Sequence, residues 1–181
     1  MSAQTESSPA RSDKAAAKAA AKGAARASGR LAAVQALYQL ELTEASSDDV
    51  LKDFIVGRQG GIAITEDPAT AQEQFVDLCA ADTGLMVDLV RCFEARRIEI
   101  DAMMASSLSA DWPADRLEIL LKSILRAAIA ELLVRADVPP RVTISEFVDI
   151  AHAFYPGPEP RLVNAVLDRV ARALGRLESK S

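Results

Sequence analysis

Side chains that could perform acid–base, redox or metal chemistry are few and scattered in this sequence. His152 is the one histidine, and neither cysteine lies near it along the chain. Because catalysis and metal binding need several such groups within reach of one another, we expect His152 to be a structural or surface residue. Cys79 and Cys92 have no zinc-ligand spacing and form no disulfide framework. We expect both to be reduced and buried.

Motifs for nucleophilic or phosphoryl-transfer chemistry are also absent from the sequence. Gly57, Gly60 and Gly61 do not match the spacing of a Gly-rich phosphate loop. Paired acids such as Asp48 and Asp49 fall where loops or helix starts are predicted, and there they interact favourably with a helix dipole. The sequence therefore predicts a protein that is not an enzyme and that has no catalytic residues, no metal and no cofactor.

Basic side chains near the N-terminus are the clearest candidates for binding chemistry. Residues 1–30 hold six Lys or Arg against two acids, a balance of +4, whereas the remainder holds 15 against 24, a balance of −9. Five of the six recur every fourth residue: Lys14, Lys18, Lys22, Arg26 and Arg30. A basic arm on an acidic body favours contact between the arm and a polyanion, and a solubilising tail is the alternative.

The elements that must position these side chains are predicted to be helices. Half of the residues are hydrophobic but only 4% are aromatic, which favours helices packed on helices. Apolar groups at helical spacing predict helices over residues 28–43, 48–56, 72–81, 84–104, 114–136, 143–154 and 161–177. The sequence thus predicts an all-α fold of six or seven helices with no convincing strand.

Local signals add detail to two of these helices. Thr143 and Glu146 fit a capping box at the start of the sixth helix. The fifth helix is apolar nearly all round and is expected in the middle of the domain. Its two charged residues, Arg126 and Glu131, are expected to pair with other buried charges and fix the helix packing.

The chain divides into an arm, one helical domain and a short tail. Residues 1–27 are predicted to be a disordered Ala- and Lys-rich arm that could become helical on a partner. Residues 28–177 form the domain, with a loop or insertion at 57–72, and residues 178–181 form the tail. No segment reads as a signal peptide or a membrane span, so we expect a cytoplasmic protein without membrane contact.

Two parts of the sequence resemble the NusB family of transcription antitermination factors. Residues 29–38 resemble the opening helix of the family, from Arg30 through Gln35 to Tyr38. A second, longer match follows in register and at the family's spacing: residues 122–133, 137–139, 142–151 and 162–168. Each piece alone is weak, but together they make a specific match over roughly half the chain.

The resemblance implies a fold, a function and partners. NusB proteins are all-α, with two small helical bundles packed across each other. They bind boxA-type nascent RNA together with NusE, a protein of the small ribosomal subunit, and help RNA polymerase read through terminators in ribosomal RNA operons. A homodimer occurs in some relatives and would cover the RNA face. By resemblance, this chain is expected to be an RNA-binding transcription factor that joins the antitermination complex of RNA polymerase.

The resemblance also implies residues that contact RNA or NusE. The family's RNA surface begins at the start of its first helix, which here carries Arg26 and Arg30. A second part lies near the start of the last helix, where Arg161 and Asn164 stand. For Asn164, an interior position bonded to a neighbouring helix is the alternative.

Three further residues complete the expected sites. Positions that are often basic in the family hold Ala27 and Ser28 here, so the basic run is shorter. We therefore hypothesise that the arm residues Lys18 and Lys22 compensate as RNA contacts. Tyr38 resembles a residue of the NusE-binding face, and core packing with an exposed hydroxyl is the alternative for it.

Two other functions compete with this interpretation. NusB-like domains also precede RNA cytosine methyltransferase domains, but that arrangement needs a glycine-rich α/β domain and a catalytic cysteine after residue 181. A helical protein-interaction module that contacts its partner through the acidic body, without RNA, is the other alternative. Salt-sensitive binding of RNA by the protein distinguishes an RNA-binding factor from such a module.

Overall fold

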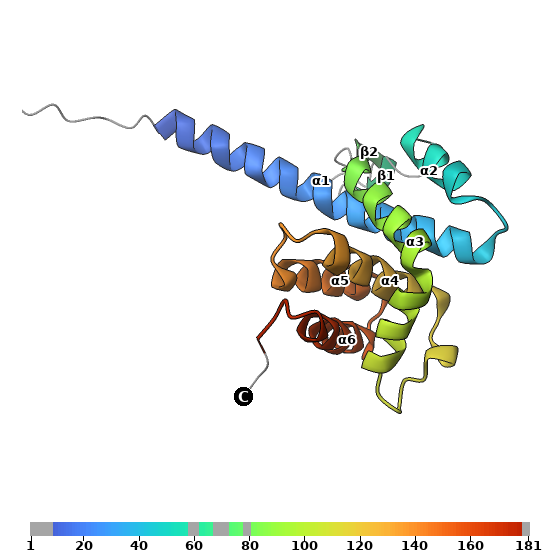
Figure 1. Cartoon of the computed structure of the whole chain (residues 1–181). Coiled ribbons are helices and arrows are strands. Elements are labelled where there is room, and N and C mark those ends of the chain that lie inside the picture. The colour runs from blue at the N-terminus through green and yellow to red at the C-terminus, as the bar shows by residue number, and fades with distance from the viewer. Residues whose placement is uncertain (1–8, 58–61, 67–72, 78–80, 179–181) are drawn as a thin grey trace, which may run out of the picture.

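The computed structural model describes residues 9–57, 62–66, 73–77 and 81–178 (Figure 1). This part of the chain forms six α-helices, one 3-10 turn and a two-stranded hairpin. In chain order the elements are α1 (Pro9–Leu42), α2 (Ser47–Ile55), β1 (Ile62–Glu66), β2 (Glu73–Asp77), α3 (Thr83–Ser107), η1 (Ala114–Arg116), α4 (Ile119–Val134), α5 (Pro140–Phe154) and α6 (Glu159–Ala173). The predicted helical fold is confirmed.

Helix α4 lies at the centre of the domain. Helices α1, α2 and α3 form one group and α4, α5 and α6 form the other, with α4 contacting both α1 and α3 across the boundary. Almost every residue of α4 from Ser123 to Leu132 is buried. A helix that is apolar on all sides can be stable only when neighbours cover every side, and α4 has four such neighbours.

Helix α1 begins earlier than the sequence indicates. The arm was expected to be disordered over residues 1–27, with the first helix starting at Ser28. Residues 1–8 lie outside the described residues, and from Pro9 onward the arm continues α1 and projects away from the domain (Figure 1). Alanine has the highest helix propensity, and the buried half of α1 supplies the costly helix nucleus, so the helix extends outward without tertiary support.

The region between α2 and α3 differs most from the prediction. A helix was expected over residues 72–81, but Glu73–Asp77 is a strand that pairs antiparallel with Ile62–Glu66, inside the predicted loop or insertion at 57–72. The register places Ile64 opposite Phe75. A five-residue run of mixed apolar and polar residues cannot be assigned to helix or strand by periodicity, and pairing with a distant segment decides the outcome.

Two helix starts in the second group also differ from the prediction. Helix α5 begins at Pro140, where a proline is favoured because its missing N–H is not needed in the first turn. The capping box predicted at Thr143 and Glu146 is therefore wrong: Thr143 is inside the helix, and its hydroxyl donates to Glu131 Oε1 at 3.2 Å. The predicted helix over 114–136 is divided, because Leu117 is extended between η1 and α4.

Gly29 fixes where α3 begins against α1. The Asp82 N–H donates to the Ala25 carbonyl at 2.9 Å, and the Asp82 carboxylate caps α3 by accepting from the Leu85 N–H at 3.0 Å. A Cβ at position 29 would lie 2.6 Å from the Asp82 carbonyl oxygen, which is closer than real Cβ atoms approach. Only glycine therefore allows the two backbones to meet here without a shift.

The predicted pairing of Arg126 is confirmed. Its guanidinium donates to both oxygens of Asp101 at 2.8 and 3.1 Å and to Glu41 Oε2 at 3.2 Å. It also lies over the Phe93 ring, 5.2 Å from the centroid. These contacts join α1, α3 and α4.

Among the described residues, no helix is long and apolar enough to cross a lipid bilayer.

Candidate nucleic-acid interface

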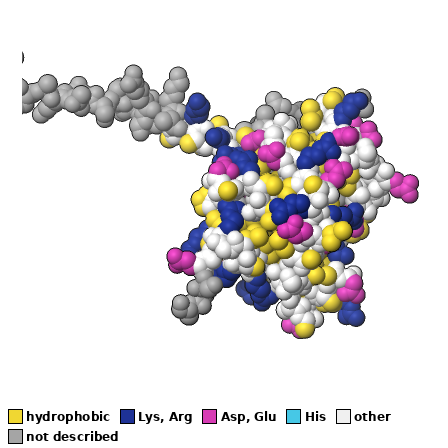
Figure 2. Space-filling view, in the orientation of Figure 1, with side chains coloured by type: hydrophobic (Ala, Val, Ile, Leu, Met, Phe, Trp, Pro, Cys, Tyr) yellow, Lys and Arg dark blue, Asp and Glu magenta, His cyan; other side chains and the backbone are white. Residues whose placement is uncertain are grey.

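The described part of the arm presents basic side chains to solvent. Lys18 and Lys22 are exposed on α1 and pair with no acid among the described residues. Figure 2 shows basic side chains where the arm leaves the domain, whereas basic and acidic side chains alternate over the body. The structure thus leaves both lysines available to a polyanion, as their predicted role requires.

Arg26 marks the base of the arm, where α1 meets the start of α5. Its side chain is half-buried and lines a small groove of about 240 Å³ with Asp137, Pro139 and Val142. The guanidinium of Arg135 lowers the pKa of Asp137 to about 2, and the charge of Arg26 contributes to the shift. Arg26 therefore lies beside a carboxylate that stays ionised at neutral pH, without an ion pair of its own among the described residues.

Arg30 does not belong to the basic surface. Its side chain is only 3% exposed, and it donates to Glu131 through Nε at 2.8 Å and through Nη2 at 2.7 Å. Nη1 donates to Glu146 Oε2 at 2.9 Å. Burial opposes the charge, but these bonds and the two carboxylates outweigh it and raise the pKa of Arg30.

The structure thus contradicts the prediction that Arg30 contacts RNA. All of its side-chain nitrogens point at carboxylates inside the domain, so a phosphate could reach it only by breaking a buried ion pair. The same contacts confirm the expected pairing of Glu131 with a buried charge. This ion pair connects α1, α4 and α5 and holds the two groups of helices together.

The two residues predicted on the last helix lie on its solvent-facing side. Arg161 and Asn164 are both exposed, whereas their neighbours Leu162 and Val163 are buried. The alternative of an interior Asn164 is therefore wrong, and its amide is available to a ligand. The arm and the start of α6 thus each present the polar groups that were predicted there.

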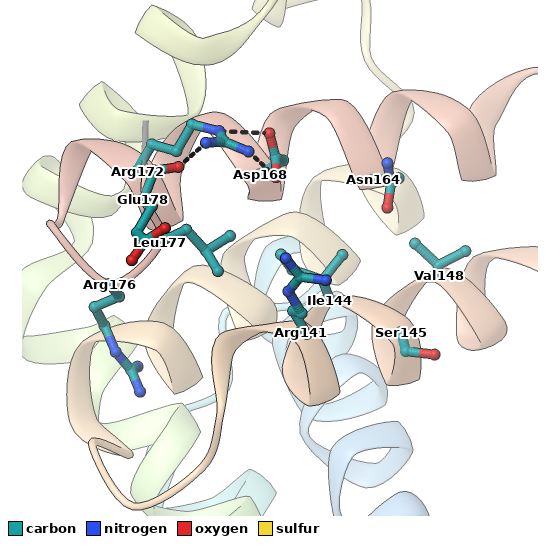
Figure 3. Close-up of a pocket in the computed structure, with 10 residues that line it drawn as sticks. All are labelled: Arg141, Ile144, Ser145, Val148, Asn164, Asp168, Arg172, Arg176, Leu177 and Glu178. Atoms are coloured by element: carbon teal, nitrogen blue, oxygen red, sulfur yellow. Dashed lines mark hydrogen bonds and ion pairs between the residues drawn. The ribbon is translucent and has the colours of Figure 1, made fainter. Parts of the chain in front are cut away.

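A groove of about 780 Å³ runs between α5 and α6 and contains Asn164 (Figure 3). Two of its arginines already have hydrogen-bond partners within the protein. Arg172 donates to both oxygens of Asp168 at 2.8 and 3.1 Å and to the Glu178 carbonyl. Arg176 donates to the carbonyls of Leu132, Arg135 and Val138 at 2.6, 3.0 and 2.7 Å, and so caps the end of α4.

The third arginine of this groove is free. Arg141, in the first turn of α5, is exposed and makes no hydrogen bond or ion pair with the described residues. Arg141 is not among the RNA contacts predicted from the sequence. It stands directly after Pro139 and Pro140, at the start of α5, and no motif in the sequence marks it as a contact.

Tyr38 lines a second groove, of about 760 Å³, at the other end of α1. Its side chain is 38% exposed, and Leu42 and Phe154 beside it are 53% and 45% exposed. Tyr38 is thus partly exposed at this groove. Exposed apolar side chains that gather around a concave surface are typical of a protein-binding site.

Gln39 adds a polar feature to this apolar groove. Its side chain contributes to the lining, and its Oε1 atom is buried without a hydrogen-bond partner among the described residues. Because a buried acceptor without a partner is costly, an N–H or O–H donor from a bound partner would stabilise the complex.

Comparison with known proteins identifies the family of the chain. The family model described as the NusB family matches residues 27–172. The chain belongs to the NusB family. It is 52% identical over 150 residues to the transcription antitermination protein NusB of Rhodospirillum rubrum, a match that covers 80% of this chain and 81% of that protein. The family resemblance seen in the sequence is thereby confirmed.

Solved NusB structures share the fold. NusB of T. maritima superposes with a TM-score of 0.62 at 26% identity, over 81% of this chain and 90% of that one. A crystal structure of the antitermination factors NusB and NusE in complex with dsRNA matches with a TM-score of 0.60 at 21% identity, over 81% and 96% of the two chains. The NusB family thus accounts for the helical domain, and it places α1 from residue 27 onward within the matched region.

Proposed function

We propose that this NusB-family protein is a non-catalytic transcription antitermination factor that binds boxA-type nascent RNA together with NusE. The observation that carries the proposal is the 52% identity to a transcription antitermination protein over four-fifths of both chains. The available cations of the arm and of α6 support it, because phosphate contacts by Lys and Arg dominate the affinity of proteins for RNA. By the same proposal the protein is cytoplasmic, acts in ribosomal RNA operons and joins the RNA polymerase antitermination complex.

The positions of the basic residues and of the apolar Tyr38 groove support separate binding surfaces for RNA and NusE. Lys18, Lys22, Arg26, Arg161 and Asn164 contact RNA, and the apolar groove at Tyr38 binds NusE. The exposed rings and the unpartnered Gln39 oxygen suit a protein better than a polyanion, since no basic residue lines that groove. The arm and the Tyr38 groove lie at opposite ends of α1, so RNA on the arm leaves the Tyr38 groove open to NusE.

Binding of a boxA-like single-stranded RNA to the protein, with and without NusE, tests the proposal at two salt concentrations. We expect salt-sensitive binding that tightens when NusE is present, because each ligand occupies its own surface. Binding of NusE without RNA would instead support a protein-interaction module. Binding of neither would mean that the fold has been kept and the role has changed.

Self-association bears on the same surfaces. A homodimer that covered the arm would compete with RNA, so RNA would shift such a dimer towards monomer. Sedimentation of the protein with and without the boxA-like RNA measures this directly. We expect any dimer that forms to dissociate when the RNA is added.

A further inference from the structure

We propose that the groove between α5 and α6 is a binding site for the phosphodiester backbone of single-stranded RNA, with Arg141 as its main contact. This inference rests on the proposed function and extends it to a residue that the sequence did not indicate. Arg141 lies in the groove on α5, and Arg161 stands one turn before Asn164 on α6.

The first support is the geometry of the two helix faces. At about 100° per residue, Arg161, Asn164, Asp168 and Arg172 fall within one narrow face of α6. Arg141, Ser145 and Val148 likewise share one face of α5. Because the groove is lined by residues of both faces, they look towards each other across it (Figure 3).

The second support is the balance of charge in the groove. Its lining includes three arginines against Asp168 and Glu178, which leaves one positive charge in excess. Arg172 and Arg176 are held by Asp168 and by carbonyl oxygens at the end of α4, so they shape the groove and do not need a ligand. Arg141 is the one guanidinium of this groove without a partner among the described residues, so it is the cation most accessible to a phosphate.

The third support is the chemistry around Arg141. A free guanidinium can bind two oxygens of one phosphate, and hydroxyl and amide donors commonly complete such sites. Ser145, one turn after Arg141 on α5, and Asn164, across the groove on α6, are exposed and can supply those donors. Ile144, Val148 and Leu177 form an apolar wall against which a ribose or base can rest.

The shape of the surface favours a chain over a small anion. Arg161 and Arg172 are eleven residues apart on α6, which corresponds to about 16 Å along the helix. Arg26 lines the small groove beside Val142, which lies in the first turn of α5 together with Arg141. A backbone that passes from the arm over Arg141 to the start of α6 would meet Arg26, Arg141 and Arg161, with the amide of Asn164 before the last of them.

The test measures the affinity of the full-length protein for a boxA-like single-stranded RNA as a function of salt. We expect Arg141→Ala to weaken binding about ten-fold and to lower the slope of log affinity against log salt by about 0.7, the share of one phosphate contact. Arg141→Lys should keep the slope and recover only part of the affinity, because the charge remains but the planar fork is lost.

Arg116→Ala serves as the matched control, since Arg116 is also exposed and lies in the η1 turn away from the groove. It should bind RNA like the wild type. If Arg141→Ala behaves like Arg116→Ala while the wild type binds RNA in a salt-sensitive way, this inference fails and the proposed function stands. Absence of RNA binding by the wild type would overturn both.

An acidic protein segment is the competing occupant, because it would also be attracted to Arg141. A poly-glutamate peptide distinguishes the two. We expect it to bind weakly and to show no dependence on Arg141. Loss of peptide binding in Arg141→Ala, with RNA binding unchanged, would assign the groove to an acidic partner and overturn the RNA site.

Discussion

The projecting half of α1, from Pro9 to about residue 27, and its buried half, which ends at Leu42, belong to one helix but lie in different surroundings. The projecting half keeps Lys18 and Lys22 in solvent, whereas the buried half places Arg30 between two carboxylates. The same spacing of four residues thus produces an exposed basic surface in one half and a structural ion pair in the other. Basic periodicity alone does not identify an RNA contact, because burial decides what each cation does.

The largest effect on stability is expected when the buried ion pair of α1 is removed. Arg30→Ala leaves Glu131, which is fully buried, without its main partner, and should lower the free energy of unfolding by about 3–5 kcal/mol. Urea denaturation followed by circular dichroism measures this. Arg26→Ala, one turn earlier, should change it by less than about 0.5 kcal/mol. Equal effects of the two substitutions would remove the distinction between the two halves.

The second prediction concerns the positive charge of the projecting half of α1. The combined substitution of Lys18, Lys22 and Arg26 by Ala should weaken RNA binding about a hundred-fold and lower the salt slope by about 2, at about 0.7 per phosphate contact. Stability should change little, because Lys18 and Lys22 are exposed and the half-buried Arg26 makes no ion pair among the described residues.

Removal of exposed cations elsewhere on the domain is the control that separates contact from long-range attraction. Lys52 and Arg116 are exposed on other parts of the domain, and their combined substitution by Ala should leave the salt slope unchanged. If the control variant loses as much RNA affinity per charge removed as the arm variant does, the arm has no special role.

A third, smaller effect lies at the junction between the two halves. Gly29→Ala places a Cβ 2.6 Å from the Asp82 carbonyl oxygen, so α3 must shift against α1. We expect a loss of about 1–3 kcal/mol in the free energy of unfolding, typical of overpacking. Gly23→Ala is the control, because nothing lies within 4 Å of a Cβ there. It should be neutral or slightly stabilising by helix propensity.

The smallest expected effect is on RNA affinity at the base of the arm, where Asp137 lies near Arg26. Asp137 has a pKa of about 2 because of Arg135, so it is ionised at neutral pH and opposes an incoming phosphate near Arg26. Asp137→Asn should tighten RNA binding about two-fold, as expected for an exposed charge. The lowered pKa of Asp137 means that its ionised form stabilises the fold at any pH above the ordinary carboxyl pKa. This stabilisation is lost as the pH falls towards 2 and the carboxylate is protonated. Weaker RNA binding by this variant would show that the Arg26 region does not contact RNA.

The comparison also shows which parts of the fold the sequence could predict. The position of α4 follows from its continuous apolar composition, and α6 follows from apolar residues at helical spacing. The strands could not be predicted in the same way. Residues 73–77 become a strand because they pair with residues 62–66, and a short mixed run does not announce such a partner.

The candidate site was predictable to a similar extent. Exposure of Lys18, Lys22, Arg161 and Asn164 agrees with positions chosen from charge and resemblance. The role of Arg30 was not predictable, because its partners Glu131 and Glu146 are 101 and 116 residues away along the chain. Arg141 was missed because its importance depends on the groove that α5 and α6 form only after folding.

RNA and NusE are proposed to use separate surfaces: the arm and the α5–α6 groove for RNA, and the groove at Tyr38 for NusE. The most direct test follows the backbone amide NMR signals of the labelled protein during separate titrations with a boxA-like RNA and with NusE. We expect RNA to shift signals of the arm and of the α5–α6 groove, and NusE to shift signals around Tyr38. RNA-induced shifts confined to the Tyr38 groove, or shifts by both ligands at the same residues, would contradict the claim.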